Sequence, residues 1–368
     1  MESITSVTNH DRRAGEVGGV GRKSGSALIL VLWVLGLLSM MVASFAFEAH
    51  IEIRLTGFYR DRTKAEYLAR SGLDLAELLV FKSQKMLGTE RDPSLAETDQ
   101  WYETAYKLAE GGTVDLVHDL ADHGVGVGLI RLSITPEPAR RNVNKLIEQT
   151  PVNDETWERI LDMGGIPEEM WPTLIDSFYD WTDIDDASRP DGAETDDYYA
   201  NLDKPYRSKN GPLDTAGELS LIKGFSPVVL DGGMMPTGGR FEGEDTAIAG
   251  IWDLLTTYGD GKVNINAASE RVLQTLPEVD AEMAQAIVSQ RQARVDEAGK
   301  DRSGFKDPNE MLALIPDFPA AARELLTTTS TEFRITSTGD LNGVLRTIWC
   351  IVRFTDGRMR VLRWREDD

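Results

Sequence analysis

The chain has 368 residues, 41% of them hydrophobic and 27% charged, a composition typical of globular protein and a length sufficient for two compact domains. Its formal net charge of −22 argues against a nucleic-acid partner, because a strongly anionic surface repels phosphate. The single cysteine, Cys350, excludes an intrachain disulfide and a multi-cysteine metal site, and its apolar neighbours predict a small buried hydrophobic side chain.

A long helix is predicted near the N-terminus. Residues 27–47 carry no charge, and at 1.5 Å per residue this run of about 21 residues spans the roughly 30 Å hydrocarbon core of a bilayer. Helix-forming and apolar residues continue through 48–85, so roughly sixty residues from Ser26 are predicted to form one helix, apolar in its first third and amphipathic afterwards. Four basic residues before the apolar run favour a cytoplasmic N-terminus: Arg12, Arg13, Arg22 and Lys23.

The order of a short basic leader, a glycine and a long helix with apolar first turns resembles the type IV prepilin signature. In that class a dedicated prepilin peptidase cuts after the glycine on the cytoplasmic face. The resemblance therefore implies cleavage between Gly25 and Ser26, with the apolar segment kept as an assembly helix. A secretory signal would have a shorter apolar region before its cleavage site, although residues 41–46 resemble such a site loosely. A plain signal-anchor helix remains the alternative.

Leu30 stands at the fifth position of the expected mature chain. Most members of the prepilin class carry a glutamate there, thought to pair with the terminal amine of the neighbouring subunit. A buried carboxylate without a partner is costly in hydrocarbon, and a subunit with no neighbour above it can dispense with one. The leucine therefore indicates a subunit at the tip of an assembly.

Alternating apolar and polar residues predict strands at 113–120 and 125–135, and again at 332–341, 344–355 and 359–366. Asn342-Gly343 and Asp356-Gly357 predict tight hairpin turns between the last three. A long helix with antiparallel strands predicts an α+β, pilin-like layer, interrupted by a mostly helical insertion. The expected segments are a leader (1–25), an assembly helix (26–87), a first pilin-like part (100–135), the inserted helical domain (136–328) and C-terminal strands (329–368).

The insertion contains a weak internal repeat, in which Asn142-Val143-Asn144 corresponds to Asn264-Ile265-Asn266. Apolar residues follow each at matching spacing, which predicts two copies of an Asn-capped helix, a short turn and a second helix. The second copy resembles a helix-hairpin-helix module, a type that often binds DNA backbones through a glycine-rich hairpin. Here the hairpin, residues 277–280, carries acidic residues, which disfavours DNA binding.

Residues 180–199 form the strongest chemical cluster, because their dense carboxylates repel one another without a cation or extensive solvation. Hard oxygen ligands without nearby histidine or cysteine favour Ca²⁺ over Zn²⁺. An EF-hand register fails because Ala187 and Ser188 do not fit its loop. A solvated acidic loop and a catalytic carboxylate pair remain alternatives. The candidate ligands, brought together by a turn at residues 189–192, are Asp180, Asp183, Asp185, Asp186, Glu194, Asp196 and Asp197.

Over nearly the whole chain, these features resemble the minor pseudopilin K family of the type II secretion system. The resemblance rests on the leader around Gly25, the non-acidic Leu30, the acidic block DW-x-D-x-DD…GAE-x-DDYY and the NINAAS hairpin. It implies a pilin fold interrupted by a helical domain, bound calcium, and a tip complex with the minor pseudopilins I and J.

On this interpretation the chain is a non-enzymatic subunit of the inner membrane. Its leader is cytoplasmic, its C-terminal part lies in the periplasm, and it takes part in export of folded proteins across the outer membrane. The alternative is a membrane-anchored periplasmic carboxylate-dependent hydrolase that uses residues 180–197. A processed leader serves assembly rather than catalysis, and no partner motif for such an active site occurs elsewhere in the sequence.

Overall fold

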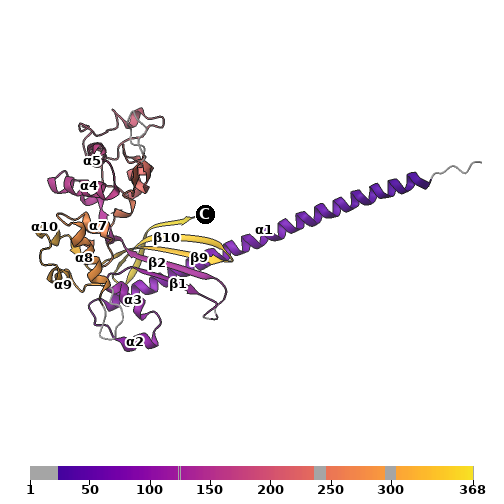
Figure 1. Cartoon of the computed structure of the whole chain (residues 1–368), viewed down its shortest axis with the longest axis horizontal. Coiled ribbons are helices and arrows are strands. Elements are labelled where there is room, and N and C mark those ends of the chain that lie inside the picture. Colours follow the sequence, from indigo (N-terminus) through magenta and orange to yellow (C-terminus); the bar gives the residue numbers. More distant parts are fainter. Residues whose placement is uncertain (1–23, 123, 125, 236–245, 295–303, 368) are drawn as a thin grey trace, which may run out of the picture. The chain divides into compact units, whose positions relative to one another are not determined.

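The structure, a computed structural model, describes residues 24–122, 124, 126–235, 246–294 and 304–367 (Figure 1). It divides into two compact units, residues 1–60 and 61–368. Most of the predicted leader, including Arg12, Arg13, Arg22 and Lys23, lies outside the described residues. The predicted cleavage site, Gly25 and Ser26, falls in the first turn of helix α1 (Ser24–Met86).

Helix α1 confirms the prediction of one long N-terminal helix and has 63 residues. By length and composition it can cross a membrane, with a mean hydropathy of 2.5 in its apolar window. In the second unit, small and apolar residues spaced three or four apart turn one stripe of the helix toward the core. The buried residues of this stripe are Ala65, Ala69, Leu73, Ala76 and Val80.

A five-stranded antiparallel sheet packs against this part of α1, with the strand order β1-β2-β9-β10-β11 (Figure 1). Asn342 and Gly343 have φ values of 54° and 81°, as a two-residue type I′ hairpin turn requires, and the predicted turn at 356–357 has the same geometry. The long helix on an antiparallel sheet agrees with the predicted α+β layer. The strands are β1 (Val114–Asp119), β2 (Leu129–Pro136), β9 (Glu332–Leu341), β10 (Val344–Thr355) and β11 (Arg358–Asp367).

Two glycines allow α1 to lie very close to the sheet. A Cβ atom on Gly339 of β9 would stand 2.0 Å from the backbone oxygen of Ala65, and one on Gly72 of α1 would stand 2.0 Å from Oγ of Ser337. Side chains at either position would therefore push the helix away from the sheet.

The core between helix and sheet also receives α3 (Tyr102–Ala109), which follows the short helix α2 (Pro93–Thr98). Cys350 is buried in this core, which confirms the prediction of a small hydrophobic role, and burial raises the pKa of its thiol to about 11. The other sheet residues of this core include Leu132, Ile134, Phe333, Ile335, Ile348, Val352 and Phe354.

The insertion leaves the sheet after β2 and returns at β9. Pro136 at the end of β2 pairs with Phe333 near the start of β9, so the two ends of the insertion lie side by side. Directly after Pro136, the fully buried Glu137 accepts a hydrogen bond of 2.7 Å from Nε of Arg334 on β9. The helices of the insertion are α4 (Pro151–Gly164), α5 (Trp171–Thr182), α6 (Pro227–Asp231), α7 (Glu270–Gln274), α8 (Ala281–Gln292), α9 (Pro308–Leu314) and α10 (Ala320–Arg323).

The expectation of a mostly helical insertion is wrong for residues 183–226, which contain only short 3-10 turns between α5 and α6. Side-chain hydrogen bonds and loop contacts replace helical regularity here. Six very short strands also occur within the insertion: β3 (Arg141–Asn142), β4 (Gly233–Met235), β5 (Thr246–Ile248), β6 (Leu255–Thr256), β7 (Val263–Asn264) and β8 (Leu326–Thr327).

The internal repeat is visible in the backbone. In the first copy β3 pairs in parallel with β6, and in the second β7 pairs in parallel with β8. Both returning strands have the sequence Leu-Thr, a match that the sequence analysis missed. Between the paired strands, each copy contains a helix pair, α4 with α5 and α7 with α8.

The asparagines of the repeat do not cap α4 or α7, contrary to the prediction, and Asn142 caps only the short 3-10 helix Val143–Lys145. Oδ1 of Asn142 and of Asn264 instead accepts the backbone N–H two residues later, at 3.0 and 2.9 Å, which forms a tight turn. Thr150 caps α4 and Ser269 caps α7.

The last asparagine of each motif holds a distant loop. Asn144 donates from Nδ2 to the backbone oxygen of Leu213 and accepts from the Leu213 N–H at Oδ1, at 2.8 and 2.9 Å. Asn266 makes the same pair of bonds with Phe305, at 2.9 and 2.8 Å. The two copies therefore share one hydrogen-bond framework, which we call the Asn-x-Asn framework.

Candidate metal-binding loop

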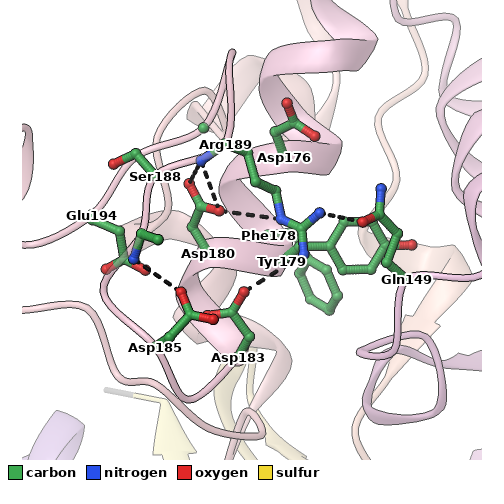
Figure 2. A network of polar contacts seen from close by, with 12 residues as sticks. Gln149, Asp176, Phe178, Tyr179, Asp180, Asp183, Asp185, Ser188, Arg189 and Glu194 are labelled. Carbon is green, nitrogen blue, oxygen red and sulfur yellow. Dashed lines mark hydrogen bonds and ion pairs between the residues drawn. The ribbon is translucent and has the colours of Figure 1, made fainter.

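Residues 180–199, the acidic loop, begin in the last turn of α5. Asp180 is fully buried, and its Oδ2 accepts hydrogen bonds from the backbone N–H of Arg189 at 3.1 Å and of Ala193 at 2.8 Å (Figure 2). The backbone N–H of Gly192 donates to the oxygen of Arg189 at 3.2 Å, so the turn predicted at 189–192 is present. A Cβ at Gly192 would lie 2.0 Å from Oδ2 of Asp180, so this turn requires glycine.

Arg189 lies among the carboxylates and was not identified from the sequence. Its Nε stands 3.2 Å from Oδ1 of Asp180, and its Nη2 stands 3.6 Å from Oδ2 of Asp183 (Figure 2). The guanidinium also lies 4.9 Å from the ring centre of Tyr179 and donates from Nη1 to Gln149. One cation thus partly offsets the repulsion between two of the acids.

Glu194 is 2% exposed and uses only one of its carboxylate oxygens. Oε2 accepts hydrogen bonds from Oγ of Ser208 at 2.8 Å and from the backbone N–H of Thr195 at 3.3 Å. Oε1 is buried and has no hydrogen-bond partner among the residues that the structure describes. A buried acceptor left in this state is costly unless water or an ion fills its place.

Two further buried oxygens in this region have no partner within the described part of the chain: Oδ1 of Asp183 and Oδ1 of Asn210. Nδ2 of Asn210 donates to the backbone oxygen of Asp185 at 3.2 Å and to Oδ1 of Asp186 at 3.0 Å. Asn210 has a φ of 49°, in the left-handed region that asparagine tolerates. The sequence analysis missed Ser208 and Asn210 because both lie outside the acidic run.

The pKa values report the cost of gathering these acids. Burial raises the pKa of Glu194 above its usual value, and the charges of Asp180 and Asp183 raise it further. Burial likewise raises the pKa of Asp183, with the neighbouring charge of Asp185 adding to the effect. The pKa of Asp180 is also raised by burial, despite its backbone hydrogen bonds. A bound cation would relieve all three.

Asp197 differs, because hydrogen bonds outweigh desolvation there. Burial acts to raise its pKa, yet bonds from Oγ of Ser188 and from the Glu194 N–H, each 2.8 Å, hold the pKa below its usual value. Both Asp197 oxygens are therefore already satisfied. Asp197 therefore links the part of the loop around Ser188 to the part around Glu194.

The remaining predicted ligands lie toward solvent. Oδ1 of Asp185 accepts the backbone N–H of Ala187 at 2.9 Å, and Asp186 is held by Asn210. Asp196 is exposed. Among the described residues, no group of three or more His, Cys, Asp or Glu side chains lies close enough to hold a metal ion as it stands. The acidic loop thus contains buried oxygens without hydrogen-bond partners, but its carboxylates are too far apart to hold an ion together.

A cavity of about 700 Å³ lies elsewhere in the described structure. It runs between α3, β1 and the end of α8, with Glu103, Asp115 and Arg291 in its wall. No residue of the acidic loop lines it. The acids of the alternative catalytic pair therefore do not face this cavity.

Comparison with known proteins identifies a consistent set of relatives. Residues 139–232 match the family model "Type II secretion system (T2SS), protein K". The chain is 23% identical over 350 residues to the type II secretion system protein K of Pseudomonas aeruginosa, covering 92% of each chain. It is 25% identical over 203 residues to a putative type II secretion system protein K of Escherichia coli K12, covering 55% of this chain and 58% of that one.

A solved structure shares the fold. It is the crystal structure of the GspK-GspI-GspJ complex from the type 2 secretion system of enterotoxigenic Escherichia coli, with a TM-score of 0.56 and 16% identity. The match covers 83% of this chain and 96% of the matched chain. From the family match within the insertion, the relative aligned over 92% of both chains and this common fold, we conclude that the chain is similar over most of its length to the type II secretion system protein K.

Proposed function

We propose that the protein is a minor pseudopilin that assembles with I-type and J-type pseudopilins at the tip of the pseudopilus and takes part in export of folded proteins. The observation that carries the proposal is α1, a single helix whose residues 28–47 expose a continuous apolar surface and whose later residues pack on the sheet. An exposed apolar surface of this length requires a membrane or neighbouring helices. The structural neighbour was solved in complex with GspI and GspJ, which supports the choice of partners. The similarity to type II secretion system protein K over 92% of the chain favours this function over the alternative of a hydrolase.

The tip position is supported by Leu30, a non-acidic residue on the exposed part of α1. A carboxylate there would need a cationic partner in hydrocarbon, and only a subunit lying above could supply one. We expect Leu30→Glu to give no gain in secretion and a weaker membrane association, measured by fractionation of whole cells. Improved secretion by this variant would contradict the tip position.

Processing by prepilin peptidase between Gly25 and Ser26 is part of the same proposal, as is an inner-membrane location with the C-terminal part in the periplasm. N-terminal sequencing of the protein from membranes tests it, with Ser26 expected as the first residue. A bulky residue in place of Gly25 is expected to leave the leader attached. An intact Met1, or a start near Ala46, in the unmutated protein would contradict the pilin-type processing.

The assembly itself is tested by pull-down of the full-length protein from detergent-solubilised membranes. The I-type and J-type pseudopilins of the same cell are expected in the eluate. As a control, the same experiment with a chain lacking residues 136–328 asks whether the partners depend on the insertion or on the pilin-like part. Absence of both partners from the eluate of the unmutated chain would contradict the proposed function.

We further propose that the acidic loop binds Ca²⁺. The unpaired buried oxygens of Asp183, Glu194 and Asn210 support this, because carboxylate and amide oxygens are the ligands that Ca²⁺ accepts. Asp185, next to Asp183, would add a third carboxylate. Since no three acids among the described residues lie at metal-binding distance, the loop would close around the ion. Arg189, which contacts Asp183, would then lose that contact or share it.

We propose that the helix pairs of the insertion are helix-hairpin-helix-like repeats that serve packing of the insertion's own core rather than DNA binding. In the second copy, Asp280 caps α8 by accepting the backbone N–H of Met283 at 2.8 Å. Glu278 precedes it with a φ of 59°, in the hairpin where a DNA-binding module presents free backbone amides. These acids would repel phosphate.

A further inference from the structure

One face of the five-stranded sheet packs on α1, and the opposite face carries a concentration of arginines. Along β10, Ile348, Cys350 and Val352 point into the core. Because side chains alternate along a strand, the residues between them, and their partners on β11, point away from α1. The antiparallel register pairs Arg353 of β10 with Arg360 of β11, and three further arginines of β11 pair with residues of β10 that point to the same side. We call this set the arginine face: Arg353, Arg358, Arg360, Arg363 and Arg365.

A bulge in β11 keeps four of these arginines on one side. The register shifts between Ile351 and Val352, which pair with Arg363 and Val361 respectively, so Leu362 is an extra residue. If the same sequence formed a regular strand without the bulge, its period of two would turn Arg363 and Arg365 to the side opposite Arg358 and Arg360. The irregularity therefore gathers positive charge that a regular strand would divide between two faces.

Most of this charge is not neutralised within the described chain. Arg353 pairs with Glu332 at 2.9 Å, and Arg365 pairs with Asp367 of its own strand at 3.0 Å. Arg358 and Arg360 are exposed and have no ion pair among the described residues. The two ion pairs of Arg353 and Arg365 lie at the surface, where such pairs are weak and exchange easily with other carboxylates.

An aromatic side chain adjoins the arginine face. The guanidinium of Arg363 lies 5.5 Å from the ring centre of Trp349, and that of Arg334 on β9 lies 6.0 Å from the same ring. Beyond Trp349, hydroxyl groups of Thr338 and Thr347 meet at 2.8 Å. Arginine and tryptophan are the residues most enriched at the energetic centres of protein interfaces.

Charges on an edge strand also prevent edge-to-edge aggregation, and β11 is an edge of this sheet. That role needs charge somewhere on the strand. Protection of the edge does not require a bulge that keeps the arginines on one face. It also does not require an arginine in contact with a tryptophan on the next strand. The arrangement therefore calls for a second explanation.

We propose that the arginine face binds an acidic protein surface, rich in Asp and Glu, on a neighbouring subunit of the secretion assembly. Arginine binds carboxylates through two parallel hydrogen bonds, which gives such a contact both charge and geometry. A partner with a local acidic patch suits a chain of net charge −22, whereas an extended anionic surface such as a membrane or nucleic acid would repel the rest of the molecule. The identity of the assembly rests on the proposed function.

The test is a charge reversal in the full-length protein, Arg358→Glu/Arg360→Glu/Arg363→Glu. Affinity for the co-expressed I-type and J-type pseudopilins is measured at several salt concentrations in detergent. The unmutated protein is expected to bind with a steep loss of affinity as salt rises, because exposed charges are screened over about 8 Å at physiological ionic strength. The variant is expected to bind at least about tenfold more weakly, with little salt dependence.

A matched control, Lys204→Glu/Arg207→Glu/Lys262→Glu, makes the same change in net charge at exposed cations of the insertion. It is expected to bind like the unmutated protein. The neutral variant Arg358→Gln/Arg360→Gln/Arg363→Gln repeats the test if the reversed protein melts at a lower temperature. The variant Arg358→Lys/Arg360→Lys/Arg363→Lys keeps the charge but loses the paired hydrogen bonds of the guanidinium, and it is expected to bind between the unmutated protein and the neutral variant.

Unchanged affinity in both the reversed and the neutral variant would overturn the inference, and the proposed function would stand if the unmutated protein binds. No binding by the unmutated protein would count against the proposed function itself. A third outcome is arginine-dependent binding to phosphatidylglycerol vesicles with unchanged affinity for the pseudopilins. That result would replace the acidic protein by a lipid surface and overturn the inference as stated.

Discussion

The two copies of the Asn-x-Asn framework make the same hydrogen bonds but support different parts of the molecule. In the first copy, the loop held by Asn144 follows the acidic loop along the chain. In the second, Asn264 and Asn266 also donate to the backbone oxygens of Gly111 and Glu110, at 3.1 and 2.6 Å, directly after α3. One copy therefore supports a candidate ligand site, and the other joins the insertion to the pilin-like part.

This difference teaches that a repeated scaffold can be kept while its loops take separate roles. The residues that pack the helix pairs are buried in both copies, whereas the unpaired acceptor oxygens occur around the acidic loop of the first. Changes in the second copy should therefore affect folding, and changes in the first should affect ion binding as well.

The largest difference is expected between the equivalent substitutions Asn266→Ala and Asn144→Ala. Asn266 is 4% exposed and its loss leaves backbone groups of Phe305 and Glu110 unpaired, so we expect a loss of about 3–4 kcal/mol of unfolding free energy. Asn144 is partly exposed and holds only the Leu213 loop, which predicts about 1–2 kcal/mol. Urea unfolding of the full-length protein in detergent measures both. Equal losses would show that the second copy has no special structural role.

Two glycines sharpen the comparison. Gly192→Ala would place a Cβ 2.0 Å from Oδ2 of Asp180, and Gly304→Ala would place one 2.5 Å from Cγ of Asn266. Each is expected to cost about 2–3 kcal/mol, because a packed neighbour must move. Only Gly192→Ala is expected to remove the effect of Ca²⁺ on the melting temperature. Loss of that effect in the Gly304 variant would mean that the two copies are coupled.

Calcium should stabilise the protein through the first copy alone. An ion that binds only the folded state adds about 2.7 kcal/mol at a hundredfold excess over its dissociation constant. Melting temperatures in Ca²⁺ and in chelator are expected to differ by several degrees, with Mg²⁺ a poor substitute. Asp185→Ala/Glu194→Ala should abolish the difference, while Asp203→Ala/Glu282→Ala, which removes two exposed acids, should keep it. If the melting curves of the unmutated protein in Ca²⁺ and in chelator superimpose, the acidic loop does not bind calcium and is only a solvated loop.

The smallest expected effect is a dependence on pH in chelator. The pKa values of Asp180, Asp183 and Glu194 are raised in the folded state, so the folded chain binds more protons than the unfolded chain just above the usual carboxyl range. Stability is therefore expected to fall as pH rises through the raised pKa values. Bound calcium should reverse this slope, because protons then compete with the ion.

Glu194→Gln separates the two contributions. The amide carries no charge, so we expect the variant to be more stable than the unmutated protein at pH 7 in chelator and to show a weaker response to calcium. Glu278→Gln, at an exposed position in the second copy, is the control and should change neither property. A Glu194→Gln protein less stable than the unmutated one in chelator would show that the carboxylate is not strained by its neighbours.

Local patterns were enough to predict the helix and the last three strands. β9 and β10 begin and end where the alternation begins and ends, because Asn-Gly and Asp-Gly turns fix the hairpins from within a few residues. The repeat was also detectable from spacing. The role of its asparagines was not, since a helix cap and a tight turn use the same residue, and their partners Leu213 and Phe305 lie 69 and 39 residues away.

The acidic loop shows the same limit. Its carboxylates are adjacent in the chain and were identified as a group, and the turn that folds them back was identified by its Pro and Gly. Ser208 and Asn210 come from a separate loop and carry no charge to mark them. Arg189 lies within the block, but only the folded chain shows that its guanidinium stands between Asp180 and Asp183.

The pairing of Pro136 with Phe333 has a consequence for the order of folding. The β9–β10 hairpin can form as soon as its residues are available, whereas joining it to β2 closes a segment of roughly 190 residues, and contacts this distant in sequence form slowly. A folded insertion already holds its two ends together and removes most of that search. We therefore expect the insertion to fold first and to act as the nucleus on which the central sheet is completed.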